Sequence, residues 1–150
     1  MSRKVYYTQV DFLLSYRGKT FFGEWPTITE AFSLTVERFP DNEALKSITP
    51  TLFSLTFKEA YEKISEIAYF IKEKGIVPGD KLAVCGKNSP QWALAYLSIT
   101  FSGCVIVPLD HGLNGDELKN LIEFGDVKGI FADDDRIEVD VPGLCFRVSL

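Results

Sequence analysis

The 150-residue sequence has little basic charge, and this shortage excludes several classes of partner. Lys and Arg together number 16, against 21 Asp and Glu, and the net charge is −5. Binding to nucleic acid requires a basic face that neutralises phosphates, so this balance argues against nucleic acid as a partner. The sequence contains no run of five basic residues that could bind an anionic membrane surface.

Signals for secretion or membrane insertion are also missing. The first apolar run, DFLL at 11–14, is too short for the core of a signal peptide, and no small-residue cleavage site follows it. The stretch 93–109 is long and apolar, but Ser102-Gly103 and Pro108 divide it into a helix and a strand. We therefore expect a cytoplasmic protein.

Cysteine is scarce, and its spacing excludes a disulfide framework. Cys85, Cys104 and Cys145 cannot all pair, and they lie too far apart in sequence to form a metal-binding motif. Each falls in an expected strand among apolar neighbours. We therefore expect three buried, unreactive thiols in a reducing compartment.

The common catalytic and phosphate-binding motifs are absent. The turn that follows the strand expected at 81–86 lacks the glycines of a dinucleotide-binding loop and of a P-loop, so Lys87 is interpreted as a solvated loop lysine. Neither a Gly-x-Ser-x-Gly elbow nor a His-Glu-x-x-His motif occurs. The acidic run 133–135 lacks the spacing of a calcium loop and is interpreted as a solvated loop. We expect no catalytic residue in this chain.

What the sequence does contain is a regular alternation of helix and strand signals. Capping boxes at 27–30 and 56–59 predict helices that end near Phe39 and before Gly75. Two further helices are expected, from 91 to 102 and from 114 to Gly125. Strands are expected at 44–48 and 52–55, separated by a turn at 49–51, and then at 81–86, 104–109, 127–132, 137–141 and 144–150.

The order from 81 to 132 is β-α-β-α-β, which indicates an α/β fold. Its strands are continuous apolar runs, which is typical of a mostly parallel sheet flanked by helices on both faces. The helix at 91–102 is apolar nearly all the way round, so we expect it to be buried on several sides. Residues 1–26 are rich in aromatic side chains and form a separate N-terminal arm, while 27–150 carry the α/β pattern.

Three residues follow the expected strands at positions where α/β sheets bind ligands. Asn88 comes after the strand at 81–86, and Asp110 and His111 come after the strand at 104–109. One His beside one Asp does not make a catalytic triad, which needs a nucleophile and mutual geometry. We name Asn88, Asp110 and His111 as candidate cofactor-binding residues. The alternative for His111, the only histidine, is an ordinary surface-loop side chain.

Several segments together resemble the start of the AMP-forming acyl-CoA synthetases, which belong to the adenylate-forming superfamily. The joint spacing carries the resemblance, which covers about residues 27–133. Phe57 stands where the family pattern usually has Tyr, and Cys104 where it usually has Ala. The segments are FPDNEALKS (39–47), LTFKEA (55–60), GIVPGDKLAVCGKNSPQWALAYLSITFSG (75–103), CVIVPLD (104–110) and DELKNLIEFGDVKGIFAD (116–133).

The resemblance implies a fold and an activity. The fold is the N-terminal subdomain of an adenylate-forming, AMP-binding enzyme, here incomplete over 27–150. The activity is that of an ATP-dependent ligase, which joins a carboxylate to the α-phosphate of ATP and then passes the acyl group to coenzyme A, with Mg²⁺ on the phosphates. The aromatic arm, 1–26, favours the branch that acts on long-chain fatty acids, in the cytoplasm or at the membrane periphery.

The family's phosphate loop, adenine-binding segment, ribose-binding aspartate and mobile-domain lysine do not occur in this chain. We therefore expect the chain alone to be inactive, to bind no ATP, Mg²⁺ or coenzyme A, and to need the remainder of a parent chain as its partner. Two alternatives stay open: a stand-alone, non-catalytic α/β interaction module, and part of an adenylation domain that loads a carrier protein. An unfinished sheet edge and an apolar helix would also allow the fragment to self-associate.

Overall fold

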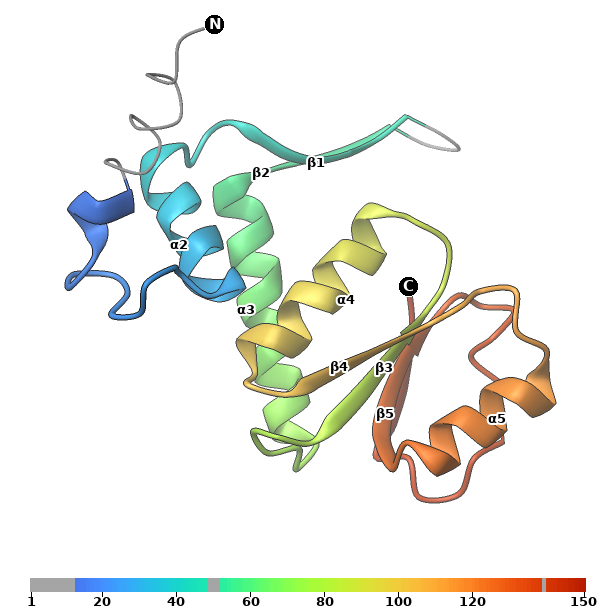
Figure 1. Cartoon of the computed structure of the whole chain (residues 1–150). Coiled ribbons are helices and arrows are strands. Elements are labelled where there is room, and N and C mark those ends of the chain that lie inside the picture. The colour runs from blue at the N-terminus through green and yellow to red at the C-terminus, as the bar shows by residue number, and fades with distance from the viewer. Residues whose placement is uncertain (1–12, 49–51, 139) are drawn as a thin grey trace, which may run out of the picture. The chain divides into compact units, whose positions relative to one another are not determined.

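The computed structural model describes residues 13–48, 52–138 and 140–150. The chain divides into two compact units, Met1–Pro40 and Asp41–Leu150 (Figure 1). The turn expected at 49–51 and the first part of the aromatic arm, residues 1–12, lie outside the described residues. None of the helices in the described ranges is long and apolar enough to cross a membrane.

The described part of the first unit is organised around α2, Ile28–Arg38. The capping box expected at its start is present: the Thr27 N–H donates to Glu30 Oε2 at 2.8 Å, and the Glu30 N–H donates to Thr27 Oγ1 at 3.3 Å. These two bonds satisfy amide groups that the first helical turn leaves without partners. The helix ends at its C-cap residue Phe39, as the sequence predicts.

The second unit contains a two-stranded hairpin and a four-stranded parallel sheet. In the sheet the strand order is β4-β3-β5-β6, and the hairpin pairs β1 with β2 in antiparallel fashion. The expected α/β fold with a mostly parallel sheet is therefore confirmed. In chain order the elements are β1 (Glu43–Ser47), β2 (Phe53–Thr56), α3 (Phe57–Glu73), β3 (Lys81–Cys85), α4 (Pro90–Phe101), β4 (Val105–Leu109), α5 (Gly115–Phe124), β5 (Val127–Ala132) and β6 (Phe146–Ser149).

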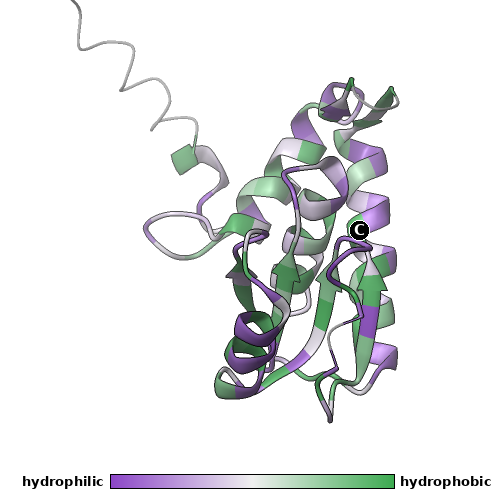
Figure 2. Ribbon diagram, turned by 90° about the vertical axis from the view of Figure 1, so that its right-hand side faces the viewer, coloured by the Kyte–Doolittle hydropathy of each residue, from purple (hydrophilic) through white to green (hydrophobic). Residues whose placement is uncertain are grey.

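Each face of the sheet is covered by a separate hydrophobic cluster. Successive side chains of a strand point to opposite faces, so on β3 Leu82 and Val84 pack in one cluster while Ala83 and Cys85 pack in the other. The first cluster also holds residues of α3 and α4, and the second holds residues of α5. Figure 1 accordingly shows α4 and α5 on opposite sides of the sheet, and the sheet strands are mostly green in Figure 2.

The apolar helix α4 is buried on several sides, as predicted. Gln91 is its one exposed residue; the others are buried or half-buried. Its polar residue Ser98 is fully buried, and the Ser98 hydroxyl donates to the Leu94 carbonyl at 2.6 Å. The buried hydroxyl is therefore satisfied inside the helix and needs no partner from another element.

Two predictions near the end of the chain are wrong. The described residues of 137–141 form no strand, because the N–H groups of Arg136 and Ile137 both donate to the Asp133 carbonyl and close a turn. The last strand is only Phe146–Ser149, and Cys145 lies just before it as an exposed residue instead of a buried one. Cys85 and Cys104 are buried as expected.

Candidate functional site

The carboxyl ends of β3 and β4 open on a pocket of about 380 Å³. From this edge β3 leads into α4 on one face of the sheet, and β4 leads into α5 on the other face, so the two loops diverge. Parallel α/β sheets bind ligands at this kind of switch point. All three sequence-predicted residues lie here, since the pocket is lined by Gly86, Lys87, Asn88, Trp92, Leu109, Asp110 and His111.

The loop after β4 is shaped by the backbone and side chain of Asp110. Its Oδ1 accepts the Gly112 N–H at 2.6 Å, and its carbonyl accepts the Leu113 N–H at 3.3 Å. The Cys85 thiol donates to the same carbonyl at 3.6 Å, which ties the loop to the end of β3. Asp110 is therefore a turn-forming residue that presents His111 at the pocket.

The loop after β3 is held by a cap and by a long-range bond. Ser89 caps α4, with its Oγ accepting the Trp92 N–H at 3.0 Å, and Pro90 occupies the first turn, where an N–H is not needed. The Lys87 N–H donates to Asp133 Oδ2 at 2.9 Å, so the loop after β3 is bound to the loop after β5. Asn88 lies between these anchors, exposed at the pocket.

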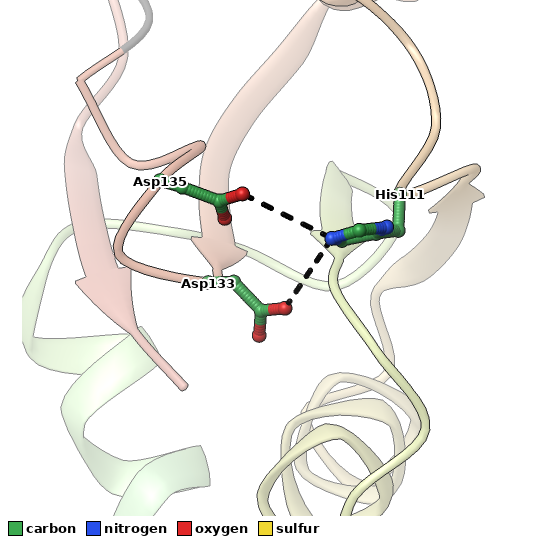
Figure 3. A group of neighbouring side chains, drawn as sticks. All are labelled: His111, Asp133 and Asp135. Carbon is green, nitrogen blue, oxygen red and sulfur yellow. Dashed lines mark ion pairs between the residues drawn. The ribbon is translucent and has the colours of Figure 1, made fainter.

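A third loop, after β5, brings two carboxylates to the same edge of the sheet. His111 Nε2 lies 4.0 Å from Asp133 Oδ2 and 4.0 Å from Asp135 Oδ2, as Figure 3 shows. The Asp133 side chain is 22% exposed and the His111 side chain 31%, whereas Asp135 is 58% exposed. Sequence reasoning did not connect these residues. The position of Asp133 and Asp135 directly after an expected strand could have indicated this, because the carboxyl ends of neighbouring parallel strands meet at one edge of the sheet.

The charges at this edge act on the buried Cys85 at the end of β3. Burial raises the pKa of the Cys85 thiol above its usual range, the Arg136 guanidinium opposes that rise, and Asp133 then adds to it. A raised pKa keeps the thiol protonated at neutral pH, so Cys85 is not a nucleophile of this site.

The residues of this edge do not fit a triphosphate. A Cβ at Gly86 would lie 2.7 Å from Asp133 Oδ1, so a carboxylate fills the space beside the one glycine of the loop. The Trp92 N–H at the start of α4 is already bound to Ser89. Phosphate sites need free backbone N–H groups and positive potential. Here the N–H groups of Lys87 and Trp92 are engaged, and the Asp133 carboxylate lies beside the loop.

Comparison with known proteins places the chain in a family. The family model for AMP-binding enzymes matches residues 32–145. Long chain acyl-CoA synthetase 1 of Arabidopsis thaliana is 29% identical over 122 residues, which are 77% of this chain and 18% of that protein. The mitochondrial medium-chain acyl-CoA ligase ACSF2 of Mus musculus is 30% identical over 104 residues, 69% of this chain and 17% of that protein. The chain therefore spans less than a fifth of the length of these relatives.

Relatives and solved structures with other names match as well. Enterobactin synthase component F of Shigella flexneri is 27% identical over 127 residues, covering 81% of this chain and 10% of that protein. Coronafacic acid ligase of Pectobacterium brasiliense superposes with a TM-score of 0.68 at 26% identity, over 73% of this chain and 21% of that one.

The N-terminal subdomain of Klebsiella oxytoca NpsA, at 22% identity, shares the fold with a TM-score of 0.67 over 84% of this chain and 31% of that one. The architecture expected from the resemblance, an N-terminal subdomain of the adenylate-forming fold, is thus confirmed by the structural matches. The family match spans both the hairpin and most of the parallel sheet. The chain belongs to the AMP-binding enzyme family.

Proposed function

We propose that this chain is part of an ATP-dependent acid–thiol ligase that makes coenzyme A thioesters of fatty acids. The carboxylate would attack the α-phosphate of ATP and release pyrophosphate, and the acyl group would then pass from AMP to the thiol of coenzyme A. One observation carries the proposal: two acyl-CoA-forming relatives match 77% and 69% of the chain at 29% and 30% identity. ATP use follows from membership of the AMP-binding family.

Within that ligase, the role proposed for these residues is structural. The chain would supply a rigid parallel sheet, with both faces covered, beside which the ATP-binding residues of a longer protein assemble. Two features support this role. The switch-point pocket does not fit a triphosphate, and the buried Cys85 thiol at the end of β3 has a raised pKa, which keeps it protonated.

Substrate, acceptor and location can be tested on the complete gene product that contains this chain. Exchange of radiolabelled pyrophosphate into ATP, measured with carboxylic acids of increasing chain length, should be fastest with long-chain fatty acids. Mass spectrometry should then detect the coenzyme A thioester of the same acid, and cell fractionation should find the protein in the cytoplasm or loosely bound to membranes. Exchange that requires an amino acid or an aryl acid, with no thioester of coenzyme A, would overturn the proposal.

A second candidate, an adenylation domain that loads a carrier protein, has its own support. Enterobactin synthase component F matches 81% of the chain, and an artificially fused adenylation–PCP di-domain of Klebsiella oxytoca superposes with a TM-score of 0.67 at 24% identity. The two candidates differ in the acceptor thiol. Transfer of the acyl group to a carrier protein bearing a thiol arm, but not to free coenzyme A, would favour this second candidate.

A further inference from the structure

We propose that His111, Asp133 and Asp135 form a binding site for a divalent transition-metal cation. The three residues come from the loops after β4 and β5, which lie on either side of β3. One ligand atom from each residue lies within 4.8 Å of the other two. Figure 3 shows the imidazole edge directed between the two carboxylates. This proposal does not depend on the proposed function.

The state of His111 Nε2 is the observation that points to a ligand. The atom is buried, and it has no hydrogen-bond partner among the described residues. An unsatisfied polar atom that is removed from water destabilises the folded state, so native structures rarely leave one without a partner. Both nearest carboxylate oxygens are 4.0 Å away, too far for a hydrogen bond. A cation between the three atoms would satisfy all of them.

The spacing of the three atoms suits a metal ion after a small adjustment. With separations of 4.0, 4.0 and at most 4.8 Å, one point lies within about 2.5 Å of all three. Zinc binds imidazole nitrogen and carboxylate oxygen at about 2.0–2.2 Å. Closing the difference requires side-chain movements of a few tenths of an ångström, and Asp135 is exposed enough to make them.

Neighbouring groups hold Asp133 in place, and a neighbouring cation competes with the metal for Asp135. The Lys87 N–H donates to Asp133 Oδ2, and the N–H groups of Arg136 and Ile137 donate to the Asp133 carbonyl, so the orientation of this ligand is fixed before a metal binds. Arg136 Nε lies 3.8 Å from Asp135 Oδ2 and is the competing cation of the apo protein. Metal binding would displace this loose ion pair, which lacks a hydrogen bond.

The donor set selects the class of cation. One imidazole nitrogen with two carboxylate oxygens suits Zn²⁺, Co²⁺ or Mn²⁺, whereas Mg²⁺ prefers oxygen ligands alone. The proposed site is therefore different from the site of the Mg²⁺ that accompanies ATP in the proposed reaction, because their ligand atoms differ. Asp135 is 58% exposed, so water could complete the coordination sphere of a bound ion from the Asp135 side, while His111 Nε2 is itself buried.

The experiment is a titration of the untagged chain with Zn²⁺ by calorimetry and with Co²⁺ by visible absorption. We expect one ion per chain, and a loss of affinity of about tenfold or more in His111→Ala, Asp133→Asn and Asp135→Asn. The matched control is Asp134→Asn, which removes the same charge from a carboxylate that instead accepts the Ser149 hydroxyl; its affinity should change less than about threefold. Cys145→Ser, which removes the exposed thiol, should bind as the parent does.

Circular dichroism of each variant establishes that it is folded, and Asp135→Asn is the decisive variant because its side chain is the most exposed of the three. The absence of saturable binding in the folded parent would overturn the proposal. It would also be overturned if Asp134→Asn or Cys145→Ser weakened binding as much as Asp135→Asn does, since the ion would then bind elsewhere.

Discussion

Gly129 of β5 lies directly under the ring of Phe146, its pairing partner on β6. A Cβ at this position would approach three ring carbons to 2.5, 2.6 and 2.8 Å. Both residues are buried, so neither the ring nor the strand can move aside freely. We predict that Gly129→Ala lowers the free energy of unfolding by about 1–3 kcal/mol, the usual cost of overpacking a core, as measured by urea denaturation.

Gly115 provides the control for this substitution. It is the first residue of α5, it is exposed, and an added Cβ would meet no atom within 4 Å. Gly115→Ala should leave stability unchanged or raise it by a few tenths of a kcal/mol, because Ala restricts the unfolded chain. Equal stability of the two variants would mean that the contact between Gly129 and the ring is looser than described.

The three thiols differ in accessibility, which gives a second prediction at this scale. Burial raises the pKa of both the Cys85 and the Cys104 thiol, so little thiolate forms at these positions near neutral pH. Cys145 is exposed. Iodoacetamide at pH 8 should therefore modify Cys145 first and the other two only after unfolding in urea, as peptide mass spectrometry can show. Modification of Cys85 at the rate of Cys145 would contradict the described burial.

At the scale of elements, the capping box at the start of α3 makes the stability of the protein depend on pH. Hydrogen bonds from the Thr56 backbone N–H and then from its hydroxyl lower the pKa of Glu59 below 4.5. Because the pKa of Glu59 is lower in the folded state than in the unfolded state, its carboxylate stabilises the folded state at pH values above the unfolded-state pKa. This stabilisation is lost as the pH falls through the folded-state pKa. The melting temperature of the parent should therefore exceed that of Glu59→Gln by a margin that narrows between pH 6 and pH 3.

Thr56→Ser is the matched control, because it keeps the hydroxyl that takes part in the capping box. Its melting temperature should follow that of the parent across the same pH range. A margin between the parent and Glu59→Gln that stays constant or widens on acidification would contradict the assigned role of the carboxylate.

The elements that could be predicted from the sequence are those whose determinants are local. The start of α3 follows from Thr56 and Glu59, three residues apart, and its end from Gly75, which adopts φ +80°. The false strand at 137–141 has apolar residues at alternate positions. In the structure, two hydrogen bonds to the Asp133 carbonyl close a turn here instead of a strand. The alternation of apolar residues carries no information about these bonds, so it predicts the wrong structure.

The candidate site was predictable only in part, for a physical reason. Asn88, Asp110 and His111 could be placed at strand ends, and the structure brings them to one pocket. The approach of Asp133 to His111 depends on β5 crossing to the far side of β3. Strand order is set by which helix covers which face, and no residue spacing in the sequence encodes it directly. From the sequence alone, Asp133 is therefore predicted only as part of a solvated acidic loop.

At the scale of the whole molecule, weak nucleotide binding is predicted, because the Lys87 and Trp92 N–H groups are engaged and the Asp133 carboxylate lies beside the loop. Calorimetry of the 150-residue chain with ATP and Mg²⁺ should give no saturable heat below millimolar concentration. Circular dichroism of the same sample provides the control that the chain is folded. An affinity in the micromolar range would mean that the switch-point pocket does accept a triphosphate. It would also contradict the structural role proposed for this part of the enzyme.

The position of β3 in the sheet has a consequence for synthesis on the ribosome. This strand is made before β4 and β5, yet it pairs with both, one on each side. Its second edge therefore stays unpaired until Ala132 has emerged, and an open edge of apolar sequence is a point where nascent chains aggregate. A translational pause within α5 would prolong that exposure and increase the demand for chaperones, whereas a pause after β5 would not.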